Sequence, residues 1–268
     1  MTLLSARNER VQRVRRLARR RRDRAEERAF VIEGPHAVEA ALDAPLGLDE
    51  VFYEHGVDPA LVARARATAA HVFEVSPGTL ARVTDAVTPQ PVVAVATWCD
   101  VPLGDVIAAV VAADGPARPV LVLHDLRDPG NVGTLLRTAE AAGVAGVVLG
   151  GTSVDVFNPK CVRASAGALF HLPVAVMVDG VEALDQLRGA GIRLIGTSAT
   201  ATTPYDECAF DGGVALVLGN EAHGLAPEMG AAMDEMVAIP IEGRAESLNV
   251  AAAGAVLCFE VARRRRAG

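Results

Sequence analysis

The sequence has very little lysine, few aromatic residues and no long apolar run. Lys160 is the only lysine among 26 basic residues, and aromatic residues make up 4% of a chain that is 51% apolar. This composition, dominated by Ala, Val, Leu and Gly, favours helices packed on a buried sheet over a β-sandwich. No apolar stretch approaches the roughly 20 residues that span a bilayer, and the arginine-rich N-terminus lacks the apolar segment of a secretory signal. We therefore expect neither a membrane segment nor secretion.

The cysteines suggest neither a metal site nor a disulfide framework. None of the four belongs to a Cys-x-x-Cys pair or has a histidine at the spacing of a zinc site. We expect reduced thiols in a cytoplasmic protein that needs no metal. The four cysteines are Cys99, Cys161, Cys208 and Cys258.

Positive charge is concentrated at the N-terminus. Residues 1–28 contain eleven arginines and four acidic residues, a net charge of +7, so the remaining residues carry −14 because the whole chain carries −7. A basic arm on an acidic body is a common pattern in nucleic-acid-binding proteins. A solvated arginine-rich helix without such a role is the alternative from charge alone. A second basic run, residues 263–266, closes the chain.

Length and the alternation of apolar runs predict two α/β domains. A helix is expected from Ser5 to Arg28, and another is expected to open at Ser76. From Val120 onward, strands and helices alternate in the manner of a parallel sheet with helices on both faces. We predict a basic N-terminal helix or arm at 1–28, a small α/β domain at 29–100, a linker at 101–118 and a larger domain at 119–268.

Three polar loops in the larger domain carry the residues suited to chemistry. In the first, Asn131 is expected to cap the helix that follows strand 120–124, and Arg137 lies off the apolar stripe of that helix. The alternative for this pair is a capping asparagine and a solvated arginine. Polar loops at the carboxyl ends of parallel strands are where open α/β sheets bind ligands.

The second and third loops follow the apolar runs 214–218 and 236–239. Gly219 permits close approach of the backbone to a ligand. Glu221 has a possible structural role near the start of a helix at Leu225, and His223 is a candidate general base that is more often structural in such a turn. In the third loop we expect Ser247 to be the N-cap of the last helix, with Asn249 beside it at a helix N-terminus.

Taken together, these loops resemble the motifs of the SpoU (TrmH-type) RNA ribose 2′-O-methyltransferases of the SPOUT class. The match follows the order, residue types and spacing of that family's three motifs across residues 118–265. Residues 158–168 resemble the run before the family's middle strand. Residues 30–97 more weakly resemble the ribosomal-protein-L30e-like domain that often precedes it. The motif positions are Asn131 and Arg137, then Glu221, then Ser247 and Asn249.

The resemblance implies a fold, a cofactor and an assembly. The fold is an α/β SPOUT domain whose chain end forms a deep trefoil knot, preceded by the smaller L30e-like substrate-binding domain. The cofactor is S-adenosylmethionine, and the assembly is a homodimer with the active site at its interface. The positions implied for cofactor binding are Thr197, Ser198, Gly219, Ile239, Ser247 and Leu248.

The resemblance also implies the reaction, methylation of a ribose 2′-hydroxyl in RNA, with 23S ribosomal RNA as the expected substrate. Arg137 is the best candidate to orient the substrate phosphate and hydroxyl, although the pKa of about 12 or above of an arginine makes it an awkward free base. Asn131, Glu221, Ser247 and Asn249 would order the loops and hydrogen-bond the substrate. A tRNA substrate, or a ribosome-associated RNA-binding protein without catalysis, are the alternatives. A Walker or Gly-x-Gly-x-x-Gly loop is absent, which disfavours a nucleotide-binding enzyme of another class.

Overall fold

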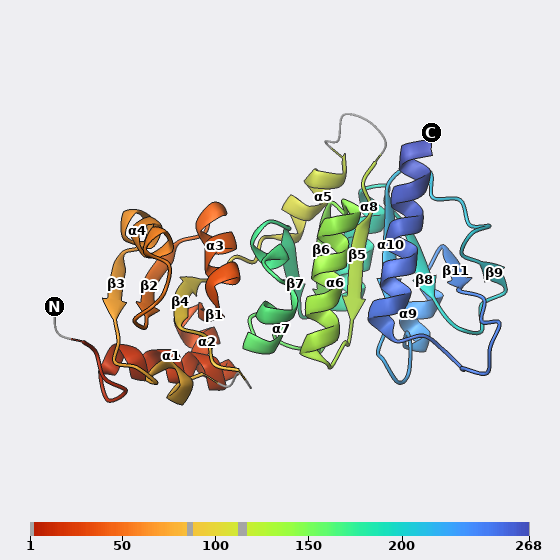
Figure 1. Ribbon diagram of the computed structural model, residues 1–268. Coiled ribbons are helices and arrows are strands. Elements are labelled where there is room, and N and C mark those ends of the chain that lie inside the picture. The colour runs from red at the N-terminus through yellow and green to blue at the C-terminus, as the bar shows by residue number, and fades with distance from the viewer. Residues whose placement is uncertain (1–2, 85–87, 112–116, 268) are drawn as a thin grey trace. The chain divides into compact units, whose positions relative to one another are not determined.

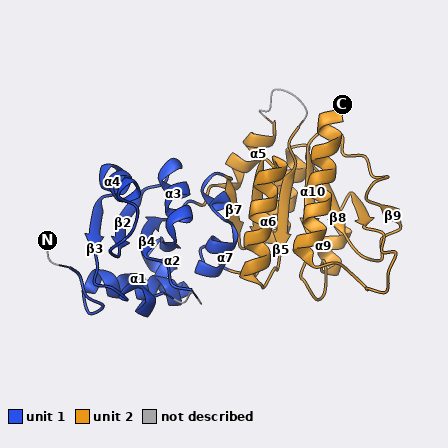
Figure 2. Cartoon of the chain, viewed as in Figure 1, with its two compact units in different colours: residues 1–99, 155–171 blue, residues 100–154, 172–268 orange. Residues whose placement is uncertain are grey.

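The computed structural model describes residues 3–84, 88–111 and 117–267, and residues 112–116 of the expected linker lie outside this part. The chain divides into two compact units (Figure 2). Unit 1 comprises Met1–Cys99 and Asp155–His171, and unit 2 comprises Asp100–Val154 and Leu172–Gly268. The described residues contain no helix that is both long enough and apolar enough to cross a membrane.

Unit 1 is built on a four-stranded sheet with the order β1-β4-β2-β3. Strand β4 runs antiparallel to both of its neighbours, whereas β2 and β3 are parallel. The helix expected to open at Ser76 is reduced to a short 3-10 turn, η1 (Leu80–Arg82). The other elements of this unit are α1 (Glu9–Arg19), α2 (Arg21–Glu27), β1 (Ala29–Glu33), α3 (Pro35–Asp43), β2 (Leu48–Tyr53), α4 (Pro59–Thr68), β3 (His71–Glu74), β4 (Val92–Thr97), α7 (Pro159–Ala164) and the 3-10 turn η2 (Ala168–Phe170).

The basic N-terminal stretch is part of the core of unit 1 and does not extend from it as an arm. Val11, Val14 and Leu17 of α1 are fully buried and pack with apolar residues of β1, β2 and β4. The single helix expected from 5 to 28 is interrupted at Arg20, whose extended backbone separates α1 from α2. The three- to four-residue spacing of the apolar positions explains why α1 lies along the sheet.

Residues 155–171 pack into unit 1 although their sequence lies within the range predicted for the larger domain. Asp155 forms a buried ion pair with Arg24, with 2.7 Å between carboxylate and guanidinium. Arg163 binds the buried carboxylate of Glu33 at 2.9 Å. The ring of Phe157 stacks on Trp98 and also contacts Phe30, with the ring centres 4.8 and 4.9 Å apart. Breaking a buried pair leaves an uncompensated charge, so these contacts fix the segment firmly.

Unit 2 is built on a seven-stranded, wholly parallel sheet with the order β7-β6-β5-β10-β8-β11-β9. The prediction of a parallel sheet is therefore confirmed, and the trefoil knot stays a prediction. The elements are α5 (Leu103–Val111), β5 (Val120–His124), α6 (Pro129–Ala142), β6 (Gly146–Gly150), β7 (Val174–Met177), α8 (Gly180–Gly189), β8 (Arg193–Thr197), β9 (Thr203–Pro204), β10 (Val214–Leu218), α9 (Pro227–Ala231), β11 (Glu235–Ala238) and α10 (Val250–Ala267).

Helices cover both faces of this sheet. Helices α6 and α10 lie side by side on one face (Figure 1). On the other face, α5, α8 and α9 pack against strand residues of alternating position, such as Val120, Val122 and Val217. Burial on both faces explains why the central strands are uninterrupted apolar runs. Helix α5 lies within the range suggested as a linker, yet its Leu103 and Val106 are buried in this core.

The connections reverse direction between β5 and β10. From β5 the chain proceeds to β6 and β7 on one side, whereas β10, β8 and β11 lie on the other. The parallel register places Leu218 beside Leu123 and Val217 beside Gly196, so these strands end at similar levels. Open α/β sheets bind ligands outside the carboxyl ends of their strands at such a switch point.

The close packing of α10 on α6 depends on Gly254. A Cβ atom at this position would stand 2.3 Å from Cδ2 of Leu135 and 2.9 Å from Cδ1 of Leu218. Both leucines are buried beneath α10. Helix α10, which follows the third polar loop, therefore contacts side chains of α6 and β10 at a point where its own backbone has no room for a side chain.

We expect Gly254→Ala to lower the free energy of unfolding by about 1–3 kcal/mol, because overpacking of a core displaces its neighbours. Urea denaturation followed by circular dichroism measures this change. Gly189→Ala is the matched control, because a Cβ at that helical position meets nothing within 4 Å. Equal stability of the two variants would contradict the proposed close contact.

Candidate functional site

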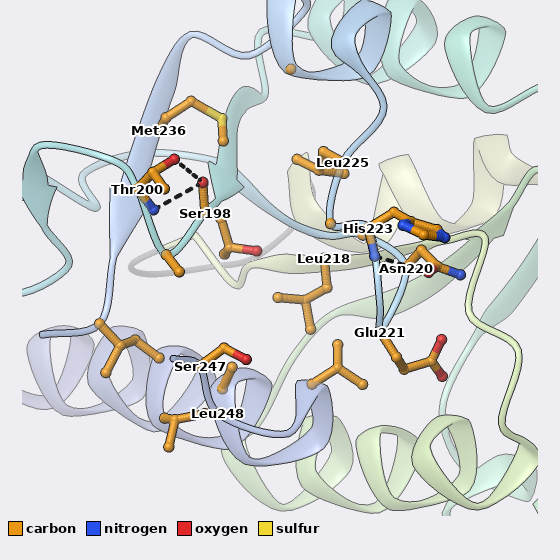
Figure 3. A pocket seen from close by; sticks show the side chains of 18 of the residues that line it. Ser198, Thr200, Leu218, Asn220, Glu221, His223, Leu225, Met236, Ser247 and Leu248 are labelled. Atoms are coloured by element: carbon orange, nitrogen blue, oxygen red, sulfur yellow. Dashed lines mark hydrogen bonds between the residues drawn. The ribbon is translucent and has the colours of Figure 1, made fainter. Parts of the chain in front are cut away.

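A pocket of about 480 Å³ lies at the carboxyl ends of the strands in unit 2. Figure 3 shows Ser247 and Leu248 on the side of the pocket opposite Ser198 and Thr200, with Glu221 at another edge. The walls of the pocket come from the loops that follow β8, β10 and β11 and from the start of α10. This volume lies within the range typical of small-molecule and cofactor sites.

All six residues implied for cofactor binding line this one pocket. Apolar side chains from four separate segments supply much of the wall, and hydroxyl groups lie among them. Among the predicted catalytic residues, Glu221 and Ser247 also line it. The six are Thr197, Ser198, Gly219, Ile239, Ser247 and Leu248, and other apolar lining residues are Leu218, Met236, Val250 and Leu257.

The charge of the lining restricts the ligand. Glu221 is the one acidic residue among the described lining residues, which include neither lysine nor arginine. A ligand with several phosphate groups would therefore find no lysine or arginine to bind in the described lining. A ligand with an apolar ring system, hydroxyl groups and a net positive charge fits the lining better.

The carboxylate of Glu221 binds the loop between β5 and α6. Its oxygens accept hydrogen bonds from the backbone N–H groups of Arg127 and Asp128, at 3.1 Å each, and from the amide of Asn131 at 3.3 Å. Partial desolvation raises the pKa of Glu221, but these hydrogen bonds outweigh it and the net pKa is lowered. The helix expected near Leu225 is α9, which begins at Pro227 and has no side-chain N-cap, so Glu221 does not cap it among the described residues.

Asn131 joins the first loop to the third. Its side-chain oxygen accepts a hydrogen bond from the amide of Asn249 at 3.2 Å, while its own amide donates to Glu221. The three loops therefore share one chain of hydrogen bonds, Asn249 to Asn131 to Glu221, which we call the three-loop network.

Two expected N-caps are corrected. Asp128 caps α6, because its carboxylate accepts from the N–H groups of Gly130 and Asn131, and Asn131 lies within the first turn. Asn249 replaces Ser247 as the cap of α10, because its side-chain oxygen accepts from Ala251 at 2.9 Å. The corrections leave the side chain of Asn131 available for the network.

Asn220 organises the pocket loop, and the sequence interpretation gave it no role. Its side-chain oxygen accepts from the N–H groups of Ala222 and His223, and its amide donates to the carbonyl of Asp125 at 2.9 Å. Its main chain pairs with Gly224 in both directions. Asparagine often forms turns by hydrogen-bonding to the backbone N–H groups that follow it, and the position of Asn220 directly after Gly219 is the signal that was available in the sequence.

Gly219 is required by the turn itself. A Cβ at this position would stand 2.3–2.4 Å from backbone atoms of Gly224 and Leu225. The close approach expected at Gly219 is therefore made by the protein's own loop, which folds back over the end of β10.

Arg137 is not brought into the three-loop network. It is exposed, and within the described residues its guanidinium has no hydrogen bond or ion pair. Six residues separate it from Asn131 on α6, which places it about 9 Å farther along the axis and about 120° around it. His223 lines the pocket and contributes its backbone N–H to the turn.

The described residues contain no group of three or more His, Cys, Asp or Glu side chains suited to a metal ion. The four cysteines are free thiols. Burial raises the pKa of Cys258 to about 12, so this thiol stays protonated at neutral pH and is unsuited to nucleophilic chemistry.

Comparison with known proteins identifies the family. The SpoU rRNA Methylase family matches residues 118–259, and the MRM3-like substrate binding domain matches residues 8–94. A 23S rRNA (guanosine(2553)-2′-O)-methyltransferase, RlmP of Bacillus subtilis, is 34% identical over 257 residues, which cover 96% of this chain and 97% of that protein.

Two solved structures resemble the whole chain. An AdoMet-bound rRNA methyltransferase from Sinorhizobium meliloti matches with a TM-score of 0.87 and 30% identity, covering 98% of both chains. The SpoU methyltransferase AviRb from Streptomyces viridochromogenes, in complex with AdoMet, matches with a TM-score of 0.87 and 27% identity, covering 97% of this chain and 100% of that chain.

The fold and the site define an α/β protein with a ligand pocket at the switch point of a parallel sheet. This chain belongs to the SpoU rRNA methylase family. The family predicted from the three loops is thus confirmed, and so is the prediction of an enzyme that transfers methyl groups. The roles of the individual site residues stay predictions.

We expect Gly219→Ala to weaken binding of S-adenosylmethionine by at least about tenfold, because a loop displaced by even 1 Å loses its ligand geometry. Isothermal titration calorimetry measures the affinity. Gly230→Ala provides the control, since Gly230 also lines the pocket but an added Cβ meets nothing within 4 Å. Equal affinities of the two variants would show that the turn at Gly219 does not govern the pocket.

Proposed function

We propose that this chain transfers a methyl group from S-adenosylmethionine to a ribose 2′-hydroxyl of 23S ribosomal RNA. The observation that carries this proposal is the pocket without lysine or arginine in its described lining, whose second and third loops are tied to the first loop through Glu221, Asn131 and Asn249. The 23S rRNA activity in the printed name of the Bacillus subtilis relative supports the substrate. Such RNA is a cytoplasmic substrate, which agrees with the free cysteines.

The pocket fits S-adenosylmethionine in its chemistry. Leu218, Ile239 and Leu248 provide apolar surface for a purine ring, and the hydroxyls of Thr197, Ser198 and Ser247 lie among them. The carboxylate of Glu221 and the absence of lysine and arginine from the described lining suit a ligand with a sulfonium and an ammonium group. Two AdoMet-bound structures of the same architecture support the assignment. When bound, this cofactor supplies the electrophilic methyl group.

The protein's own residues would position the acceptor. A ribose hydroxyl is a weak nucleophile and needs polarisation or loss of its proton in the transition state. We assign the orientation of the substrate phosphate and hydroxyl to Arg137, whose planar guanidinium suits bidentate binding of a phosphate. We assign the ordering of the loops around the acceptor to Glu221, Asn131 and Asn249, and hydrogen bonding to the bound molecules to Ser247.

A homodimer, which we propose, would explain why Arg137 lies apart from the network of its own chain. Ile241, Leu248 and Phe259 are apolar side chains exposed on the third loop and on α10, with exposed fractions of 37%, 39% and 46%. Covering such a surface with a second copy would bury it and would bring α6 of the partner toward the pocket. Arg137 would then serve the site of the partner.

Unit 1 would bind the RNA, and the structure narrows the arginines that are available for this role. Several arginines of residues 1–28 are already paired with carboxylates, as Arg10 and Arg13 are with Glu50. Deletion of residues 1–100 would not test RNA binding by unit 1 alone. Residues 155–171 also pack into unit 1, and the deletion would expose their apolar side chains. Within residues 3–28, the exposed arginines whose guanidinium groups have no hydrogen bond or ion pair to the described residues are Arg7, Arg15, Arg20 and Arg21.

Mass-spectrometric mapping of ribose methylation in RNA from cells with and without this gene tests the function. One 2′-O-methyl group in 23S rRNA that disappears with the gene is the expected result. Loss of a methyl group in tRNA would move the substrate to the alternative class. Unchanged methylation of all RNA would favour a ribosome-associated protein without catalysis.

We expect Arg137→Ala to reduce methyl transfer at least about a hundredfold, the usual scale for losing acid–base or positioning help. The variant should stay folded and dimeric and should bind S-adenosylmethionine normally. Arg137→Lys should not restore turnover, because an ammonium group cannot reproduce the planar fork. Tritiated methyl transfer to ribosomal RNA is the assay, and Arg266→Ala is a control with an exposed arginine.

Mixing two inactive variants tests which chain supplies Arg137. A heterodimer of Arg137→Ala and Glu221→Ala chains contains one intact site only if Arg137 acts on the partner's pocket. Activity that reappears on mixing supports action across the dimer, and continued inactivity places Arg137 in its own chain's site. Near wild-type turnover of Arg137→Ala alone would refute the assignment.

We expect replacement of Arg15, Arg20 and Arg21 by glutamine to weaken RNA binding and to flatten its salt dependence. Each lost phosphate contact should lower the slope of log K against log salt by roughly one, because fewer counterions are released. Filter binding at several salt concentrations measures the slope. Arg22→Gln is the control, because Arg22 already pairs with Glu26 at 2.6 Å. An unchanged slope in the triple variant would exclude this surface.

A further inference from the structure

Asp125 directly follows β5 and has a strained backbone conformation. Its φ angle of +56° lies in the left-handed region, where residues other than glycine are uncommon and Asn and Asp are the best tolerated. Its carboxylate oxygen Oδ1 accepts hydrogen bonds from the backbone N–H of Thr152 at 2.6 Å and from the Thr152 hydroxyl at 2.8 Å. Strain of this kind persists only where the surrounding structure holds it.

The loop after β6 wraps closely around this carboxylate. A Cβ atom at Gly151 would stand 2.5 Å from Oδ1 of Asp125, and Gly151 itself has a φ of +67°. Partial burial raises the pKa of Asp125, but the two hydrogen bonds from Thr152 and the nearby His124 and Arg127 outweigh it, and the net pKa is lowered. The carboxylate is therefore ionised at neutral pH.

Arg127 completes the contact from the other side. Its guanidinium donates to the Thr152 hydroxyl at 2.6 Å, so this hydroxyl accepts from Arg127 while it donates to Asp125. The backbone N–H of Val154 also donates to the carbonyl of Leu126 at 2.8 Å. We call the arrangement of Asp125, Arg127 and Thr152 the 125–152 clamp.

The clamp holds the two loops of the site by main-chain groups. The carbonyl of Asp125 accepts the amide of Asn220, which organises the pocket loop, and the N–H groups of Arg127 and Asp128 bind Glu221. The orientation of these three backbone groups depends on the backbone conformation of the turn at Asp125. The clamp therefore determines where the pocket loop and the three-loop network stand, although its own side chains do not line the pocket.

We propose that Asp125 and Thr152 are positioning residues that set the geometry of the cofactor pocket through Asn220 and Glu221. This proposal rests on the proposed function. Because the clamp acts on the pocket loop, its loss should weaken binding of S-adenosylmethionine and leave RNA affinity unchanged. A residue with a merely structural role would lower stability and would reduce both affinities only in proportion to the folded fraction.

Asp125→Asn is the central variant, because asparagine keeps the shape of the side chain and tolerates the left-handed backbone while it removes the charge. We expect S-adenosylmethionine to bind about 10–100-fold more weakly, the scale of small misplacements in preorganised sites. Thr152→Val should reproduce much of this loss, and Thr152→Ser should restore binding. Asp179→Asn is the matched control, because Asp179 caps α8 with its carboxylate and does not line the pocket.

Calorimetry with S-adenosylmethionine, RNA binding and thermal unfolding are measured on each preparation. The double variant Asp125→Asn, Thr152→Val should lose less affinity than the sum of the two single losses, because Thr152 donates to the side chain of residue 125 and both changes weaken this one contact. Wild-type affinity in a folded Asp125→Asn protein, or additive losses in the double variant, would overturn the clamp. Failure of the wild-type protein to bind S-adenosylmethionine would instead overturn the proposed function itself.

Discussion

The carboxylate of Glu221 is the contact on which the site depends. It binds two backbone N–H groups and the amide of Asn131, and Asn131 in turn binds Asn249. In the sequence, Asn131 lies 90 residues from Glu221 and 118 residues from Asn249. The first and second loops meet because they follow β5 and β10, which are neighbouring parallel strands that end at similar levels. Each hydrogen bond contributes only about 0.5–3 kcal/mol, and those to the charged carboxylate lie in the upper part of this range. The sheet therefore supplies the stability of this region, and Glu221 supplies the relative placement of the loops.

Much of the sheet could be predicted because its strands are buried on both faces. The bounds predicted for β5 and β10, 120–124 and 214–218, are those of the structure. The sequence also allowed the polar residues of the site to be predicted, because loops that follow parallel strands lie together at one edge of the sheet. The two N-cap predictions, Asn131 and Ser247, were wrong for a local reason. Each loop offers two short polar residues, and intrinsic preference cannot choose between Asp128 and Asn131 or between Ser247 and Asn249. Pro129 decides the first case, since proline favours the first helical turn and leaves the cap to the residue before it.

Contacts between distant segments could not be predicted from local pattern. Residues 155–171 follow β6 in the chain, yet they pack into unit 1 through the ion pair of Asp155 with Arg24 and the rings around Phe157. The sequence around Asp155 does not indicate that its side chain pairs with Arg24, which lies 131 residues earlier in the chain. The same limit applies to charge. A net of +7 in residues 1–28 overstates the charge available to RNA, because carboxylates such as Glu50 lie elsewhere in the chain and neutralise part of it.

The separation of Arg137 from Glu221 has an electrostatic reason under the proposed reaction. A guanidinium placed beside the Glu221 carboxylate would form an ion pair and would compete with the backbone N–H groups that this carboxylate now accepts. An exposed Arg137 without a carboxylate partner among the described residues keeps its full charge for a phosphate. The described lining of the pocket thus contains a carboxylate and no lysine or arginine, which suits the proposed cofactor. Exposed arginines lie instead where the RNA backbone would approach under the proposed function.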